Sequence, residues 1–398
     1  MALFRFEEAV RKAIDEKVIA NAVVVASSRD FKYEKAFGNL TLEDHSPPVQ
    51  LDGLFWIFSC TKMIATVAIL QCVERGLVTL DQPLSSILPE WENPKVFAGE
   101  DKVTGQPLVT PSTYDITLRQ LLTHTSGMGY EFNSPLIEAW LKSRPSIPHI
   151  RDIRQEYNAP LLFAPGTIGK WQYGVGIDWV GQVVERVNGG IRLGDYMKEN
   201  IFEPLGMTES TFRPLQQPDL MARMVPRMNR AEDGSLSIDP MDVLPHIEPV
   251  DDSAGGGLYS TAADYHRLMV SIMRDDGKVL KTASIDEMFR PQLQECEELQ
   301  ETLSNLGSAK RVASGVPGGP KEVKWNHGLA GIVAVDGVPG VAAKGTMWWS
   351  GLANTFWFMD RETGTCGFYG SQLLPASDDA TGMLFKQLQE NLYSLANR

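Results

Sequence analysis

The chain has 398 residues, of which 43% are hydrophobic and 22% charged, and its formal net charge is −13. This composition is typical of a folded globular protein and excludes a largely disordered or fibrous one, while the length predicts two subdomains around an enlarged core. The acidic balance repels phosphate backbones and anionic membranes, so we expect no nucleic-acid partner and no membrane partner.

The first ten residues contain two glutamates and no long apolar stretch, so we do not expect a signal peptide. No run of about twenty apolar residues predicts a membrane span. The chain has four cysteines, Cys60, Cys72, Cys296 and Cys366. Their spacing does not match a metal site and fits reduced thiols, which favours a cytoplasmic protein.

Helical periodicity over residues 4–16 predicts an opening helix. Two strands are predicted next, over residues 21–28 and 33–38, joined by a turn. From residue 59 to about residue 76 the pattern is that of a mostly apolar helix, which ends with charged residues and a glycine. We expect this helix to be buried at the centre of the protein.

Residues 80–245 are rich in proline, glycine and short helical patterns, and they predict a mainly helical subdomain. After a glycine run, Thr261 is a suitable cap for the start of another helix. Residues 300–345 mix glycine, proline and short β-type runs, and their structure stays open.

Three strands are predicted late in the chain, over residues 346–351, 355–359 and 366–371. A final helix is predicted from about residue 378 to 395. Because chain termini commonly lie near each other, this order predicts a sheet built from both chain ends with helices inserted between them.

Ser59 and Lys62 are three positions apart at the predicted start of the central helix, so they share a face and can come within hydrogen-bonding distance. Serine is a weak nucleophile that needs an adjacent base, and a desolvated lysine can serve. The helix N-terminus also suits an oxyanion. The alternative is that Ser59 simply caps the helix. We expect Cys60 to point away from Ser59 and to pack as a small side chain.

Tyr173 lies on a glycine-rich turn just before a predicted helix. A phenol near a buried ammonium can act as a phenolate or relay a proton, although a core aromatic packed beside Trp171 is the alternative. The third motif has small residues on a late strand, which would let a substrate pass close to the backbone. It consists of Trp349, Ser350, Gly351 and Leu352.

Together with two further segments, residues 121–128 and 255–264, these motifs resemble the serine β-lactamase-like superfamily. The branch they resemble contains class C β-lactamases, D-aminopeptidases and family VIII esterases, and the resemblance spans roughly residues 5–395. Details of residues 58–62 and 349–355 are most similar to fungal acyltransferases and esterases, such as the lovastatin-pathway acyltransferase.

The resemblance implies an α+β fold of the β-lactamase/transpeptidase-like class, with an antiparallel sheet built from both chain ends and flanked by helices. Residues 1–80 and 246–398 would form the sheet subdomain. Residues 81–245 would form the inserted, mainly helical subdomain, with the active site at the interface.

The resemblance also implies roles for single residues. Ser59 would be the acyl-accepting nucleophile, Lys62 its base and Tyr173 the group that shuttles the proton. The oxyanion hole would consist of the backbone N–H of Ser59 and that of Leu352, directly after the third motif. His124 and the glycine run at 255–257 match motifs that are mainly architectural in the family, so we expect a structural histidine.

Two departures from the β-lactamase pattern bear on substrate choice. Gly174 and Val175 follow Tyr173, so the amide of the Y-x-N motif is missing, and Trp349 stands where the lysine of K-T-G would be. We therefore do not expect recognition of a β-lactam carboxylate and amide. The W-x-G pattern is similar instead to esterases and fungal acyltransferases.

The predicted function is a serine acyltransferase or esterase that moves or hydrolyses an acyl group from an ester or thioester in secondary metabolism, without a cofactor or metal. Its partners would be a small-molecule acyl donor and an alcohol or amine acceptor, with an acyl carrier protein as a candidate donor. Aromatic residues around the third motif favour an apolar, polyketide-like substrate, unless they only pack the sheet. They are Trp348, Trp349, Phe356 and Trp357.

Three alternatives remain open at this point. One is a carboxylesterase or amide hydrolase that uses water as acceptor, because the choice depends on how the site excludes water. Another is a catalytically silent ligand-binding protein on the same fold, which intact Ser59, Lys62 and Tyr173 disfavour. A metal hydrolase is disfavoured because the six histidines show no H-x-x-x-H pairing.

Overall fold

The computed structural model describes residues 3–145, 151–239, 248–295, 297–304 and 323–396. The expectation that Cys296 is a reduced thiol lies outside these residues, as do His149 and His246. Within them, no helix combines the length and the apolar character needed to cross a membrane.

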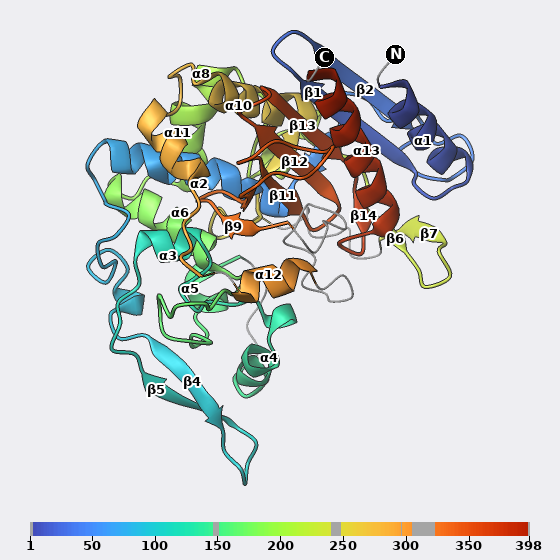
Figure 1. The fold of residues 1–398 in the computed structure, drawn as a ribbon. Helices are drawn as coiled ribbons and strands as arrows, with labels where there is room; N and C mark the ends of the chain where they lie inside the picture. The colour runs from blue at the N-terminus through green and yellow to red at the C-terminus, as the bar shows by residue number, and fades with distance from the viewer. Residues whose placement is uncertain (1–2, 146–150, 240–247, 296, 305–322, 397–398) are drawn as a thin grey trace.

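The main sheet of the described residues is antiparallel and draws its strands from both ends of the chain (Figure 1). Strands near the N-terminus join those near the C-terminus where Val24 lies opposite Tyr369. In spatial order the strands are β2 (Lys32–Gly38), β1 (Asn21–Ser27), β13 (Thr365–Gly370), β12 (Thr355–Asp360), β11 (Met347–Gly351), β10 (Ile332–Ala334) and β9 (Trp325–His327). The predicted fold class is confirmed.

Helices cover both faces of this sheet (Figure 1). On one face lie α1 (Phe4–Asp15) and α13 (Asp379–Ala396), close to the predicted first and last helices. On the other face α10 (Ala262–Arg274) packs against β1 and β13, and its cap is Thr261, as predicted. The two chain ends lie near each other (Figure 1).

Neighbouring residues of β13 contact different helices, because side chains alternate between the two faces of a strand. The ring of Phe368 lies 5.0 Å from that of Tyr265 in α10. The ring of Tyr369 lies 6.5 Å from that of Phe385 in α13. The strand is therefore buried on both faces, which explains its nearly continuous apolar sequence.

The helix α2 (Thr61–Glu74) is the buried central helix that the sequence predicts. Its side chains are mostly apolar and are buried on every side from Thr61 to Cys72, as expected for a helix enclosed by protein. It packs against α6 (Gly176–Val187). It begins two residues later than predicted, because a 3₁₀ turn, η1 (Phe58–Cys60), contains Ser59.

Between residues 81 and 245 most described elements are short helices. The remaining α-helices of the described chain are α3 (Leu118–Leu122), α4 (Pro135–Lys142), α5 (Ile153–Glu156), α7 (Leu193–Met197), α8 (Glu203–Leu205), α9 (Pro218–Met221), α11 (Thr282–Phe289) and α12 (Glu297–Ser304). Short 3₁₀ turns are η2 (Pro89–Trp91), η3 (Glu131–Asn133) and η5 (Pro214–Gln216), and η4 (Lys198–Phe202) is a π-helical turn. The predicted subdomain boundaries stay a prediction.

Three small sheets complete the described fold. One joins β3 (Leu54–Trp56) to β8 (Tyr259–Thr261), directly before η1 and α10. The others pair β4 (Lys95–Glu100) with β5 (Pro107–Pro111), and β14 (Leu373–Leu374) with β6 (Met228–Arg230) and β7 (Leu236–Ile238). The β3–β8 pair fixes the segment that leads into Ser59.

Candidate active site

Ser59, Lys62 and Tyr173 meet in one hydrogen-bonded cluster. The Ser59 Oγ lies 2.6 Å from the Tyr173 hydroxyl and 3.1 Å from the Lys62 Nζ. Lys62 and Tyr173 are buried, whereas Ser59 is partly exposed. The cluster therefore presents one accessible hydroxyl between two buried groups that can exchange protons with it.

The backbone before Ser59 is strained. Phe58 has a φ of 44°, in the left-handed region that bulky residues rarely adopt. Its carbonyl accepts a 2.6 Å hydrogen bond from the Thr61 hydroxyl, and its ring stacks on Trp56 at 4.2 Å. These contacts stabilise the 3₁₀ turn η1, which places Ser59 outside α2.

The alternative that Ser59 caps the helix is not what the structure shows. Cys60 occupies the N-cap position of α2 and provides no side-chain cap, while the Ser59 hydroxyl bonds to Lys62 and Tyr173. The Cys60 thiol lies 3.7 Å from the Thr355 carbonyl and is buried, as predicted. Burial raises the pKa of this thiol to about 12, so it stays protonated near neutral pH.

Lys62 has three oxygen neighbours. Besides Ser59, its Nζ donates to the Gly255 carbonyl at 2.6 Å and lies 3.2 Å from the Tyr130 hydroxyl. A carbonyl can only accept, so one N–H of Lys62 points at Gly255. The two hydroxyls can both accept and donate, which leaves them as the groups that can pass protons to or from this amine.

Asp178 is a buried carboxylate beside this cluster, in the first turn of α6. Its Oδ1 accepts hydrogen bonds from the Ser253 hydroxyl at 2.6 Å and from the Gly255 N–H at 2.9 Å. Burial raises the pKa of Asp178, while attraction to Lys62 acts in the opposite direction. Asp178 thus anchors the loop whose carbonyl holds Lys62.

Gly255 cannot carry a side chain in this arrangement. A Cβ at this position would lie 2.2 Å from the Asp178 Oδ2. The neighbouring Gly256 has more room, because its Cβ would meet nothing closer than the Phe58 carbonyl carbon at 3.7 Å. The architectural role expected for the glycine run thus has a steric basis at Gly255.

Sequence reasoning missed two residues of this cluster, Tyr130 and Asp178. Tyr130 is half-buried, and this burial, together with nearby Tyr173 and Asp178, raises its pKa well above the ordinary value. Tyr130 lies two positions after the 121–128 motif, and Asp178 follows Tyr173 by five positions. Their closeness to recognised motifs was the available signal.

The third motif lies beside η1 rather than along an open cleft. A Cβ on Gly351 would lie 2.4 Å from the Ile57 carbonyl and 2.2 Å from the Thr355 hydroxyl. The small residue therefore admits the protein's own backbone on this side, and the expectation that substrate passes close to the motif stays a prediction. Ser350 is buried, and Leu352 is 36% exposed at the end of β11.

The aromatic residues around the third motif pack the sheet and its surroundings. The four of them are nearly fully buried, and none belongs to the pockets described below: Trp348, Trp349, Phe356 and Trp357. Trp349 lies against the Tyr173 ring at 5.4 Å and stacks on His124 at 5.9 Å. These contacts favour the alternative that the residues pack the sheet, and the apolar substrate surface expected from them stays a prediction.

His124 is buried among aromatic rings, and its ring lies 5.0 Å from that of Tyr173 and 5.4 Å from that of His327. Burial lowers the pKa of His124 well below its usual value, and the nearby His327 and Lys62 act in the same direction. A neutral imidazole that supports the Tyr173 ring fits the structural role expected for it.

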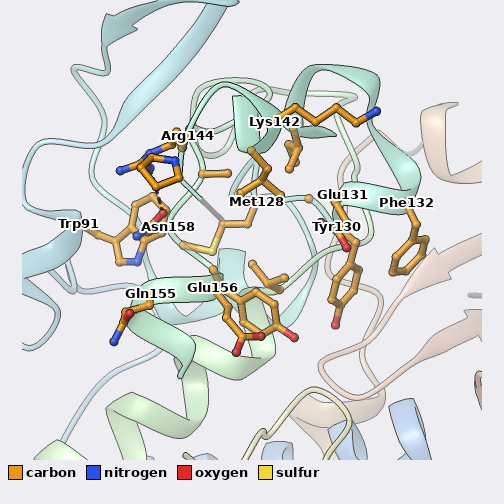
Figure 2. Close-up of a pocket in the computed structure, with 17 residues that line it drawn as sticks. Trp91, Met128, Tyr130, Glu131, Phe132, Lys142, Arg144, Gln155, Glu156 and Asn158 are labelled. Carbon is orange, nitrogen blue, oxygen red and sulfur yellow. Dashed lines mark hydrogen bonds between the residues drawn. The ribbon is translucent and has the colours of Figure 1, made fainter. Parts of the chain in front are cut away.

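Two adjoining pockets give access to the cluster. The serine pocket has a volume of about 190 Å³ and is lined by Ser59, Tyr173, Leu352 and the glycine run, among others. The large pocket has a volume of about 600 Å³, within the usual range for small-molecule sites, and extends from Trp91 past Met128 to α4 (Figure 2). Both pockets share Tyr130, Phe132 and Tyr157.

Arg151 adds a positive charge to the serine pocket. Its guanidinium carbon lies 4.8 Å from the centre of the Trp56 ring, a cation–π contact. Among the described residues, no carboxylate lies within ion-pair distance of Arg151. Arg227 also lies over Trp56, at 5.3 Å, but it is paired with Asp239 at 2.9 Å.

In the part of the chain that the structure describes, no three His, Cys, Asp or Glu side chains are grouped so as to hold an ion. The fold and the Ser59 cluster define a protein of the β-lactamase type. The chain belongs to the Beta-lactamase family, whose sequence model matches residues 6–389. This confirms the resemblance seen in the sequence.

Comparison with related proteins defines the class of enzyme more closely. The chain is 36% identical to a lovastatin esterase of Penicillium rubens, over 96% of each chain, and 32% identical to the monacolin J acid methylbutanoyltransferase of Aspergillus terreus, over 98% of this chain and 95% of that one. A mutant of simvastatin synthase from Aspergillus terreus superimposes with a TM-score of 0.90 at 32% identity, covering 100% and 98% of the two chains. The protein is therefore an enzyme of acyl transfer or hydrolysis.

Proposed function

We propose that the protein forms an acyl-enzyme on Ser59 and passes the acyl group to a small-molecule alcohol. The observation that carries this proposal is the contact of the accessible Ser59 hydroxyl with both Lys62 and Tyr173. In the first step Ser59 Oγ attacks the carbonyl carbon of an ester or thioester, and Lys62 takes its proton. Tyr173 delivers a proton to the leaving oxygen or sulfur, and the Lys62 ammonium passes the proton taken from Ser59 to the resulting Tyr173 phenolate. Lys62 is then a neutral amine again before the second step.

The negative charge that develops on the carbonyl oxygen needs donors. We assign this role to the backbone N–H groups of Ser59 and Leu352, which belong to the two segments that meet where Gly351 adjoins Ile57. Both residues line the serine pocket. The substrate contacts predicted for Trp349, Ser350 and Gly351, which directly precede Leu352, stay a prediction.

The acceptor would occupy the large pocket. Its 600 Å³ suit a polycyclic alcohol better than water alone, and its wall combines apolar side chains such as Met128 and Ile137 with polar ones. A relative named for methylbutanoyl transfer to monacolin J acid supports an alcohol of secondary metabolism as acceptor. Hydrolysis is the second candidate, supported by the likeness to the lovastatin esterase.

Arg151 points to the chemistry of the substrate. A guanidinium without a carboxylate partner among the described residues would pair with an anion in the serine pocket. We propose a substrate that carries a carboxylate, in line with the acid in the name of the Aspergillus terreus relative.

Replacing Arg151 by glutamine tests this preference. We expect kcat/KM for an acyl acceptor with a free carboxylate to fall about tenfold relative to its methyl ester, the lower range for a lost charged hydrogen bond. Steady-state kinetics on the two acceptors measure the ratio, and an unchanged ratio would contradict the proposal.

The donor and the location remain proposals as well. An acyl carrier protein could deliver the thioester, and comparing a carrier-bound acyl group with a free short thioester at equal concentration would reveal the preference. A cytoplasmic location is supported by the free state of Cys60, Cys72 and Cys366. Fractionation of the producing cells would test it.

Intact-protein mass spectrometry of wild type and Ser59→Ala, after mixing with an activated ester or a short acyl thioester, tests the proposed function. An acyl adduct and turnover in wild type alone would support Ser59 as nucleophile. Adding alcohols then separates transfer from hydrolysis by the products formed. Turnover retained in a folded Ser59→Ala variant would contradict the mechanism, and no adduct or turnover with any donor would favour a silent binding protein.

A further inference from the structure

Tyr130 links the large pocket to Lys62. Three residues line both pockets, Tyr130, Phe132 and Tyr157, and only Tyr130 is hydrogen-bonded to Lys62, at 3.2 Å. Figure 2 shows the Tyr130 ring standing at one side of the large pocket beside Phe132, whose ring stacks on it at 5.0 Å. An acceptor in the large pocket that approaches Ser59 therefore passes the Tyr130 hydroxyl.

The second half of the reaction needs a proton path of its own. Once Ser59 is acylated, its oxygen has lost the proton, and the acceptor hydroxyl must give up a proton as it attacks the acyl carbon. Tyr173 lies 2.6 Å from Ser59 Oγ, at the acylated oxygen itself. Tyr130 is the phenol that faces both Lys62 and the pocket proposed for the acceptor.

We propose that Tyr130 is a catalytic residue of the second step, a role that rests on the proposed Ser59 acyl-enzyme. The acceptor O–H donates to the Tyr130 oxygen while the Tyr130 hydroxyl donates its own proton to Lys62 Nζ. The acceptor oxygen bonds to the acyl carbon, the bond from that carbon to Ser59 Oγ breaks, and Lys62 returns a proton to Ser59 Oγ across 3.1 Å.

The environment of Tyr130 suits a relay. Its partial burial disfavours a phenolate, so the residue moves a proton by accepting one and donating one in the same step. The Lys62 contacts to Ser59 and to the Gly255 carbonyl do not depend on Tyr130. Loss of the Tyr130 hydroxyl should therefore leave acylation largely intact.

The variant Tyr130→Phe tests the relay, with Tyr157→Phe as the matched control from the same pocket walls. Rapid-quench intact mass with a p-nitrophenyl ester gives the acylation rate, and decay of the isolated adduct gives the rate of transfer to water or alcohol. In Tyr130→Phe we expect acylation within about threefold of wild type and deacylation slower by about 10²-fold, the scale of a positioned acid–base group. Tyr157→Phe should keep the wild-type ratio of the two rates.

A second measurement varies the acidity of the acceptor alcohol. Its result would not change if Tyr130 had only a structural role. Trifluoroethanol gives up its proton more readily than ethanol, so its transfer rate should fall less in Tyr130→Phe. Equal losses for both alcohols, or an equal loss of acylation and deacylation, would overturn the relay and leave Tyr130 as a residue that only positions Lys62. Absence of any adduct in wild type would instead overturn the proposed function.

A measurement on wild type decides the question if Tyr130→Phe does not fold. Two protons move together in the relay, so the deacylation rate should depend on the fraction of D₂O along a curve. A linear dependence of the deacylation rate on the D₂O fraction would indicate that one proton is transferred in the rate-limiting step. That result would overturn the proposal.

Discussion

Lys62 and Tyr173 both contact the Ser59 hydroxyl, so each should matter for acylation rather than for folding. We expect Lys62→Ala and Tyr173→Phe each to lower the acylation rate by about 10²-fold or more, because each removes a positioned proton carrier. Rapid-quench mass spectrometry with an activated ester measures this rate. Acylation at the wild-type rate in either variant would remove that residue from the mechanism.

Asp178 combines a cost in stability with a benefit in catalysis. Its pKa is raised by burial, so the native carboxyl binds a proton more tightly than the unfolded one, and wild-type stability declines as pH rises through this range. An asparagine side chain at this position would accept the same two hydrogen bonds without ionising. The stability of Asp178→Asn relative to wild type should therefore increase from pH 4 to pH 7, as urea unfolding can measure.

The same substitution should slow acylation. The charge that develops on Lys62 when it takes the Ser59 proton loses the attraction of a nearby carboxylate. We expect a loss of about tenfold, equivalent to one pKa unit of interaction. An unchanged acylation rate would mean that Asp178 only anchors the Gly255 loop.

At the residue scale, the sequence predicts contacts between residues that are close together in the chain. The contact between Ser59 and Lys62 follows from three positions on one helical face. Tyr130 lies 68 positions beyond Lys62, and Asp178 lies 77 positions before Gly255, so their approach depends on how separate elements pack. The hydrophobic periodicity of the sequence does not specify how these elements pack.

At the scale of the element, the loop that follows residue 253 controls the placement of Lys62. Gly255→Ala would press a methyl group onto Asp178, and we expect about 1–3 kcal/mol of destabilisation together with a lower acylation rate. Gly256→Ala is the matched control, because its methyl group finds ordinary contact distances. Thermal unfolding of both variants compares them, and equal stability would show that Asp178 moves aside at little cost.

The elements themselves were largely predictable, and their arrangement was less so. Alternating and apolar patterns predicted the strands near both chain ends, and the apolar run after Ser59 predicted α2 as a buried helix. The 3₁₀ turn that holds Ser59 was missed, since its stability comes from the Thr61 and Trp56 contacts. The sequence does not decide the β9 and β10 strands, because each has only three residues and gains its order from its neighbours.

For the whole molecule, buried histidines should set the response to acid. Burial lowers the pKa of His266 and of His327 to about 4, and lowers that of His124 as well. Between the unfolded value near 6.5 and about pH 4 the unfolded chain binds protons that the native protein excludes, so stability falls as pH falls.

The expected loss is about 3 kcal/mol for each of His266 and His327 over this range. Urea unfolding from pH 7 to pH 4 measures it, and His266→Gln should reduce the loss by one such step. His45→Asn, at an exposed position, is the control and should follow wild type. A flat profile above pH 5 would contradict the prediction.

The pairing of β1 with β13 has a consequence for biosynthesis. Val24 leaves the ribosome long before Tyr369, its neighbour in the sheet, so the β1–β2 hairpin must wait with one edge unsatisfied. The β11 segment that adjoins the Ser59 turn is also made late. The nascent chain therefore carries its nucleophile through most of translation before the late strands around it can assemble.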